Sequence, residues 1–206
     1  YALGRVVLAD AQPHPSPLVE SGPMASVALP LPTYRPHLPS AVVASGALSD
    51  AQLEVGIYAG EAHRRMLPGW WLRGEAAHDL RLAPADAPGA FQLRQGFFLG
   101  DGTGCGKGRA GAAQVIADNI AQRRRLHVWI SKNEPLIEDA RRDWAAIGGS
   151  PRDVVPLTAW KLGDRIRMDA GVLFVTYATL RQPARGAKAS RLDQLCAMLG
   201  DDFDGV

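Results

Sequence analysis

Residues 97–109 read FFLGDGTGCGKGR, and this stretch decides the fold. A glycine-rich turn between an apolar run and a helix aims backbone N–H groups and the positive end of a helix dipole at one spot, which favours phosphate. Lys107 adds a charge that can reach the β- and γ-phosphates of a nucleotide. The stretch therefore predicts a nucleoside triphosphate site, in which the amides from Gly104 to Gly108 bind phosphate.

The loop departs twice from the strict pattern G-x-x-x-x-G-K-[ST]. Asp101 stands where the first glycine belongs, and Gly108 stands where a serine or threonine belongs. Because that hydroxyl normally holds Mg²⁺, we expect a water molecule or Thr103 to take its place. The histidines and cysteines show no metal-ligand spacing, so no metal site built from protein ligands alone is predicted.

The segments around the loop alternate between strand and helix patterns. Continuously apolar strands that alternate with helices indicate an α/β fold with a mostly parallel sheet, covered by helices on both faces. Strands are expected at 96–100, 126–131, 153–159 and 171–180, and helices at 48–67, 107–125, 135–148 and 190–200.

The chain before this alternation has a different composition. Residues 1–44 are rich in proline, which removes backbone donors and fixes φ, so we expect an extended segment that lies over a domain surface. Residues 45–206 are expected to form one α/β lobe, incomplete at its C-terminus. Within it, Ser49 or Asp50 is a suitable N-cap for the first helix, and the turn-rich residues 68–96 predict a short hairpin or an insertion.

Composition limits the class of protein. The 206 residues carry a net charge of only +2, which by itself does not indicate a nucleic-acid partner. No run approaches the roughly 18 apolar residues of a membrane span, so no membrane association is expected. Two cysteines are too few for a disulfide framework, and a cytoplasmic location is the simplest expectation.

Two other functions remain open from the residues alone. Gly102, Gly104 and Gly106 also form the G-x-G-x-G of an S-adenosylmethionine-dependent methyltransferase, but that site needs an acidic residue at the end of the second strand. Ser131 and Lys132 stand there instead, and Lys107 would have no task. The second alternative is a nucleotide-binding module without catalytic activity.

Several separate blocks resemble the strawberry notch family of superfamily 2 helicase-like ATPases. In that family the loop reads G-D-G-x-G-x-G-K-G-R, so Asp101 and Gly108 are family features. The resemblance implies the first of two RecA-like lobes, with ATP and Mg²⁺ as cofactors. The blocks are MASVALPLPTYRPHLPS, LSDAQLEVGIYAGEAH, GWWLRGE, GFFLGDGTGCGKGR, VWISKNEPLIEDARRDW, LFVTYATL and LGDDFDGV.

The resemblance also implies roles for individual residues. Lys107 would be the catalytic residue of the loop, Gln52 would bond the adenine edge, and Tyr34 would stack on the base. The expected loop ligands of the nucleotide are Gly102, Thr103, Gly104, Cys105, Gly106, Lys107, Gly108 and Arg109. The expected contacts to nucleic acid are Ser131, Lys132, Thr176, Tyr177 and Thr179.

The resemblance further implies parts that lie beyond residue 206. The acidic motif of the D-E-A-H type would follow directly after DDFDGV, and the second lobe with its arginine finger would come later. We therefore expect this chain alone to bind nucleotide weakly and not to turn it over. The implied partner is nucleic acid, with DNA favoured over RNA.

Overall fold

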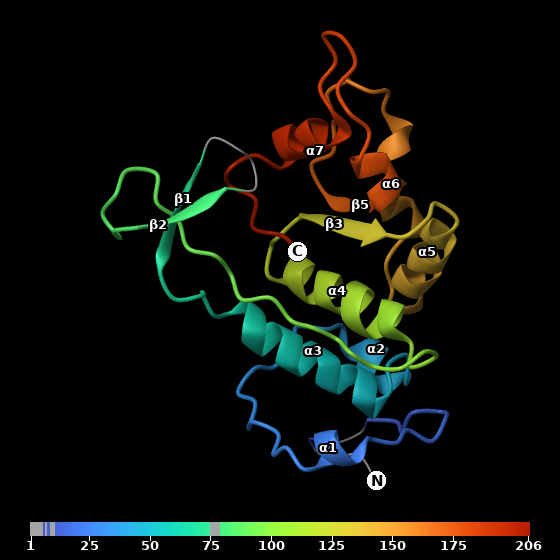
Figure 1. Cartoon of the computed structure of the whole chain (residues 1–206). Helices are drawn as coiled ribbons and strands as arrows, with labels where there is room; N and C mark the ends of the chain where they lie inside the picture. The colour runs from blue at the N-terminus through green and yellow to red at the C-terminus, as the bar shows by residue number, and fades with distance from the viewer. Residues whose placement is uncertain (1–5, 7, 9–10, 75–78) are drawn as a thin grey trace.

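A computed structural model describes residues 6, 8, 11–74 and 79–206, and a parallel sheet lies at its centre (Figure 1). The sheet contains β3 (Leu126–Ser131), β5 (Gly171–Thr176) and β4 (Val154–Pro156), in the order β3-β5-β4. Both strand pairs are parallel, and in the register Ser131 stands opposite Thr176. The α/β class and the parallel sheet predicted from the sequence are confirmed.

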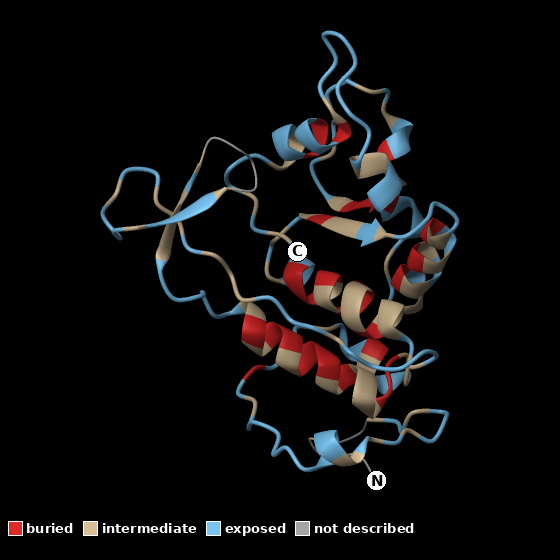
Figure 2. Cartoon of the chain, in the orientation of Figure 1, coloured by how far each residue is buried: buried red, intermediate tan, exposed pale blue. Residues whose placement is uncertain are grey.

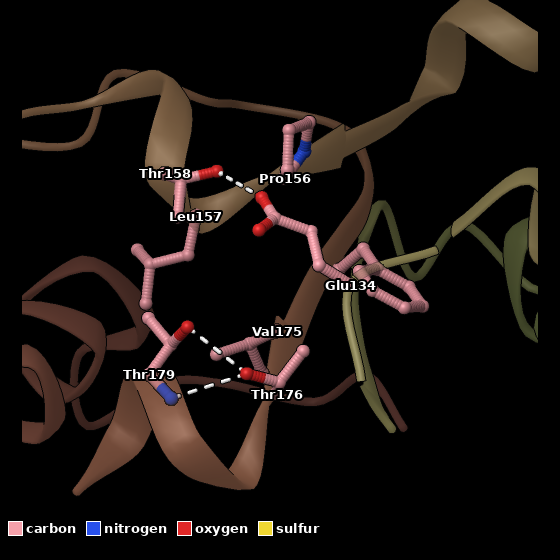
Figure 3. Close-up of a pocket in the computed structure, with 8 residues that line it drawn as sticks. Glu134, Pro156, Leu157, Thr158, Val175, Thr176 and Thr179 are labelled. Atoms are coloured by element: carbon pink, nitrogen blue, oxygen red, sulfur yellow. Dashed lines mark hydrogen bonds between the residues drawn. The ribbon is translucent and has the colours of Figure 1, made fainter. Parts of the chain in front are cut away.

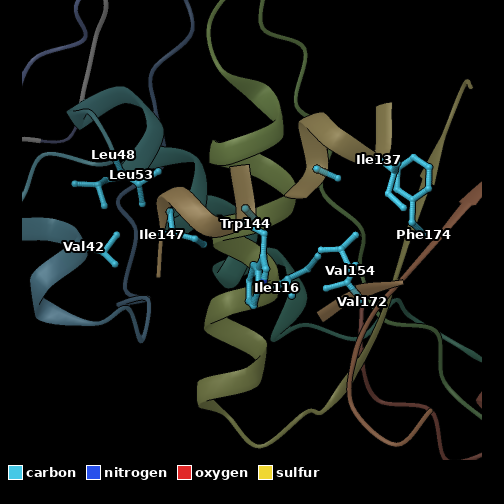
Figure 4. Packing of buried hydrophobic residues seen from close by; sticks show 12 residues of the cluster. Val42, Leu48, Leu53, Ile116, Ile137, Trp144, Ile147, Val154, Val172 and Phe174 are labelled. Carbon is cyan, nitrogen blue, oxygen red and sulfur yellow. The ribbon is translucent and has the colours of Figure 1, made fainter. Parts of the chain in front are cut away.

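The central strand β5 is buried on both faces, which explains its apolar sequence. Val172 and Phe174 face one cluster of buried side chains, and Leu173 and Val175 face another. Figure 4 shows the first cluster, where Trp144 approaches the sheet residues. Because alternate residues of a strand point to opposite faces, each face of β5 is covered by apolar side chains.

The first cluster is covered by α4 (Gln114–Ala121) and α5 (Leu136–Ala146). The second is covered by α6 (Tyr177–Leu180), α7 (Arg191–Leu199) and the connection after β4, which contains the 3₁₀ turn Leu157–Ala159. Another 3₁₀ turn, Pro151–Asp153, leads into β4. The buried residues gather on the inner sides of these helices and of the long helix described next (Figure 2).

The N-terminal part of the described chain lies on the α4 side of this α/β unit (Figure 1). It contains α1 (Gly22–Ala25), α2 (Ser40–Ala44) and α3 (Asp50–His63), and α3 begins with a capping box between Ser49 and Gln52. The Ser49 side chain accepts from the Gln52 amide, as the sequence predicted for an N-cap. Apart from α1, residues 13–39 are irregular; a domain boundary at 44/45 remains a prediction.

A hairpin projects from the unit between α3 and the glycine loop. β1 (Trp70–Arg73) and β2 (Leu80–Ala83) are antiparallel, which confirms the short hairpin predicted within residues 68–96. Arg73 pairs with Asp201 at 3.1 Å, and an Arg94 guanidinium nitrogen donates to the Asp204 carbonyl at 3.0 Å. These contacts join the hairpin region to the last residues of the chain.

Three strand predictions were wrong, wholly or in part. The predicted strand 153–159 is shortened to Val154–Pro156, and Leu157–Ala159 form a 3₁₀ turn. Residues 96–100 form no strand, and the Phe98 side chain is 90% exposed. A strand requires a neighbour that completes its hydrogen bonds, and none of the described residues pairs with this run. The predicted strand 171–180 ends at Thr176, because the Thr176 hydroxyl accepts from the Thr179 amide and caps α6.

Candidate nucleotide site at the glycine loop

The glycine loop lies at the carboxyl edge of the parallel sheet. The loop leads into a π-helical turn, Gly108–Ala113, and then into α4, which runs back to the start of β3 (Figure 1). The N-terminus of this helix therefore lies toward the end where β3 finishes. In open α/β sheets, ligands bind in the crevice beyond the carboxyl ends of the strands.

The backbone of the loop has the conformation of an anion-binding turn. Gly104 has φ +90° and Gly106 has φ +72°, while Cys105 between them keeps an ordinary negative φ. Alternating handedness along a chain turns successive amides toward a common concavity, which suits phosphate oxygens. A side chain at either glycine would be strained, which explains why the sequence has glycine at both positions.

Lys107 closes the loop in this structure. Its Nζ donates to the Asp101 carbonyl at 2.9 Å and to the Gly102 carbonyl at 2.6 Å. Both hydrogen bonds are exposed, so they add little to stability and can exchange for stronger bonds to an anion. The ammonium group is therefore held directly over the loop, and its charge is available to a polyphosphate.

Gln52 contacts the loop rather than an open cleft. Its Nε2 donates to the Cys105 carbonyl at 3.3 Å, and its Oε1 accepts from the Ser49 amide at 3.0 Å. The side chain is so close to Gly106 that a Cβ there would fall inside 3.0 Å of Nε2. The structure thus brings Gln52 to the predicted site, but both polar ends of its amide are bonded to the protein; the adenine contact stays a prediction.

Tyr34 does not have the open face that stacking on adenine requires. Its ring packs against Gly60 of α3 and is only 7% exposed. Its hydroxyl donates to Asp118 at 2.5 Å and accepts from Gln122 at 2.8 Å, and burial is the main cause that raises its pKa. In this structure Tyr34 joins the proline-rich segment to α4, and its stacking on adenine stays a prediction that this burial does not support.

Arg109 points away from the loop amides. Its Nη1 donates to the Ala47 carbonyl at 3.2 Å, and its Nε lies 4.0 Å from the Asp143 carboxylate. Asp143, on α5, was not predicted as a site residue. It is 14% exposed, and burial raises its pKa, partly offset by Arg142 and Arg109.

The predicted nucleic-acid contacts lie side by side at the ends of β3 and β5. Lys132 and Tyr177 are exposed, Tyr177 by 62%, and Ser131 is half-buried. Thr176 is only 6% exposed, and its hydroxyl lies 3.0 Å from that of Thr179. Both threonines line the small pocket of Figure 3 together with Glu134 and Thr158, and their contacts to nucleic acid stay predictions.

The donor set at the loop fits Mg²⁺ only together with phosphate. Among the described residues no three histidine, cysteine or acidic side chains gather as a protein-only metal site. Mg²⁺ is commonly held by one or two carboxylates, nucleotide phosphates and water. Thr103 is exposed on the loop, and Asp143 reaches it from α5, so oxygen ligands of the right kind are present.

Comparison with known proteins agrees with this geometry. A family model described as "P-loop containing NTP hydrolase pore-1" matches residues 13–206. The protein strawberry notch homolog of Caenorhabditis elegans is 33% identical over 97% of the chain. This chain belongs to the strawberry notch family. Its fold is that of a P-loop NTPase, consistent with a RecA-like lobe, and the methyltransferase alternative has no support.

Two other known proteins are similar to the same extent. FORGETTER 1 of Arabidopsis thaliana is 35% identical over 97% of the chain, and human strawberry notch homolog 2 is 36% identical over 94%. The chain spans only 10% of the C. elegans protein, 14% of the Arabidopsis protein and 12% of the human protein. No solved structure matches. Within the described ranges, no helix has the length and apolar character to span a membrane.

Proposed function

We propose that this chain is the ATP-binding lobe of a strawberry notch-like motor that acts on nucleic acid or nucleoprotein. The carrying observation is the left-handed glycine loop with Lys107 held over it, at the carboxyl edge of a parallel sheet. In phosphoryl transfer the protein mainly positions groups and neutralises charge. The loop amides orient the phosphates, and Lys107 neutralises their β and γ oxygens.

Lys107 is the residue that tests nucleotide binding. Replacing it with alanine removes a charge-assisted hydrogen bond of about 1.5–3 kcal/mol. ATP affinity, measured by isothermal titration, is expected to fall about 10–150-fold. Lys161→Ala is the matched control. It removes the same charge from an exposed lysine in the connection between β4 and β5, outside the loop. Equal ATP affinity for the wild type and Lys107→Ala would remove Lys107 from the site.

The nucleic-acid part of the proposal rests on a second surface. Lys132 and Tyr177 are exposed where two neighbouring strands end, on the edge of the sheet toward which the loop lies. A cation beside an exposed aromatic ring is suited to a single strand, since phosphate pairs with one and a base stacks on the other. DNA is the favoured partner, with RNA as the comparison.

Binding of fluorescently labelled single strands tests this surface. Lys132→Ala is expected to weaken binding of DNA of any sequence and to lower the salt slope by about one, as loss of one phosphate contact does. Lys161→Ala again serves as the charge-matched control. Unchanged anisotropy curves for Lys132→Ala and Tyr177→Ala would exclude this surface as the binding site. Absence of binding by the wild type would leave the chain as a nucleotide-binding module without a nucleic-acid surface.

A further inference from the structure

Gly108 leaves open where the loop finds the oxygen ligand that a serine or threonine would supply. We infer that the Asp143 carboxylate of α5 takes the place of that hydroxyl and holds the Mg²⁺ that accompanies ATP. The inference rests on the proposed nucleotide site and deepens it by assigning a residue outside the loop to the metal.

The first step is steric. A Cβ added at Gly108 would lie closer than 3.0 Å to Asp143 Oδ2, a separation that real Cβ atoms essentially never show. The carboxylate thus occupies the space in which a side chain at position 108 would begin. A serine hydroxyl lies one bond beyond its Cβ, so an Asp143 oxygen already stands next to the place where such a hydroxyl would sit. The Asp143 carboxylate can therefore occupy this space only because residue 108 is a glycine.

The second step concerns how the carboxylate is held. α5 packs along the π-helical turn that begins at Gly108, so the backbone on both sides is fixed by packing. Asp143 Oδ1 is 3.6 Å from an Arg142 guanidinium nitrogen and 4.0 Å from Arg109 Nε. Neither separation is that of a short charge-assisted hydrogen bond, which spans about 2.7–2.9 Å. Neither of these arginines holds the carboxylate in a tight pair.

The third step is chemical. A carboxylate beside bound phosphates would repel them unless a cation stands between, and Mg²⁺ prefers hard oxygen ligands of both kinds. The neighbouring Arg109 Nε has no hydrogen-bond partner among the described residues, so Arg109 does not compete with the ion for Asp143 through a short hydrogen bond. In this arrangement Asp143 contributes one oxygen to the ion, and the phosphates and water contribute the others.

The alternative role for Asp143 is purely structural, as a partner of Arg109 that helps α5 pack. Asp143→Asn separates the two roles because it keeps the shape and removes the charge. ATP affinity is measured by isothermal titration in Mg²⁺ and in EDTA for the wild type and the variant. We expect the gain on adding Mg²⁺ to fall by about 10–100-fold in Asp143→Asn. Affinity in EDTA is expected to stay the same or to improve.

Exchange of the two positions gives the sharper test. Gly108→Ser alone is expected to push the Asp143 carboxylate, the end of a flexible side chain, away from position 108. Asp143→Ala alone should lose the gain in ATP affinity on adding Mg²⁺. The double variant Asp143→Ala with Gly108→Ser has free space beside residue 108 and supplies a hydroxyl there, so it should recover this gain. With Mn²⁺ in place of Mg²⁺, electron paramagnetic resonance reports directly whether ATP-bound metal is immobilised on each variant.

The outcomes separate this inference from the proposed function. Loss of the Mg²⁺-linked gain in Asp143→Asn and its recovery in the double variant support the inference. An unchanged gain in Asp143→Asn, or a double variant that folds and stays as weak as Asp143→Ala, overturns it and leaves nucleotide binding through Lys107 intact. Absence of ATP binding by the wild type would overturn the proposed function instead. Cooperative unfolding at a midpoint close to that of the wild type establishes that each variant is folded.

Discussion

Three glycines of the loop give a graded prediction, because the structure places each under a different constraint. Gly102 has neither a left-handed φ nor an atom within 4 Å of an added Cβ. Gly104 has φ +90° and the same open surroundings. Gly106 has φ +72°, and an added Cβ would in addition collide with Gln52 Nε2. Alanine substitutions should therefore affect ATP binding in the order 102, 104, 106.

The magnitudes follow from these constraints. An alanine in the left-handed region costs about 1–2 kcal/mol, so Gly104→Ala should weaken ATP binding by about 5–30-fold. Gly106→Ala also displaces the Gln52 amide and its hydrogen bond to Cys105, worth about 0.5–1.5 kcal/mol, so the summed cost of about 1.5–3.5 kcal/mol should weaken ATP binding by roughly 10–400-fold. Gly102→Ala should stay within about twofold of the wild type, as surface substitutions usually do.

Isothermal titration of ATP into the three variants measures the series, and denaturant unfolding shows whether each remains folded. Binding is the more sensitive readout, because an exposed loop can relax locally in the free protein but must adopt one conformation around phosphate. The reasoning fails if Gly104→Ala binds ATP as well as Gly102→Ala. Their surroundings are equally open, so a left-handed φ would then have no part in binding.

Two further predictions concern stability. Tyr34→Phe should lower the free energy of unfolding by about 1.5–3 kcal/mol, because the buried Asp118 carboxylate loses a hydrogen-bond donor. Tyr58→Phe is the control: it removes an exposed hydrogen bond to Pro30 and should lower the free energy of unfolding by less than about 1 kcal/mol. Equal costs in denaturant unfolding would contradict the importance of the buried hydrogen bonds of Tyr34. Burial lowers the pKa of His127, so the unfolded chain takes up a proton near pH 6.5 that the folded chain does not bind. The free energy of unfolding should therefore fall as the pH drops through about 6.5, and it should fall less steeply in His127→Gln. An identical pH dependence in both proteins would show that His127 does not contribute.

Local signals in the sequence were sufficient for most elements of the fold. The helix that starts after Ser49 and the one that starts after Ser190 are both fixed by capping boxes that lie within four residues of sequence. The glycine loop could be predicted equally well, because its glycines and the lysine at the start of the helix are contiguous in the sequence. Each of these features is decided by neighbours along the chain, which is the information that a sequence displays.

The features that were missed depend on partners distant in sequence. The run 96–100 has the composition of a strand, but composition does not supply a neighbouring strand. Tyr34 was assigned to adenine because it is an aromatic residue upstream of Gln52, and nothing local revealed Asp118 as its partner. Asp143 reads as one charge on a solvated helix face until the fold brings it against Gly108.

The side-chain amide of Gln52 makes α3 and the nucleotide loop mechanically dependent on each other. One end of this amide completes the first turn of the helix, and the other end fastens the carbonyls of Cys105 and Gly106. Any rearrangement of the loop that pulls the amide away also breaks one of the two hydrogen bonds of the capping box at the start of α3. Glu61 of α3 also accepts a hydrogen bond from Thr33 in the proline-rich segment. A ligand that fixes the loop would therefore also affect, through α3, the position of this distant segment.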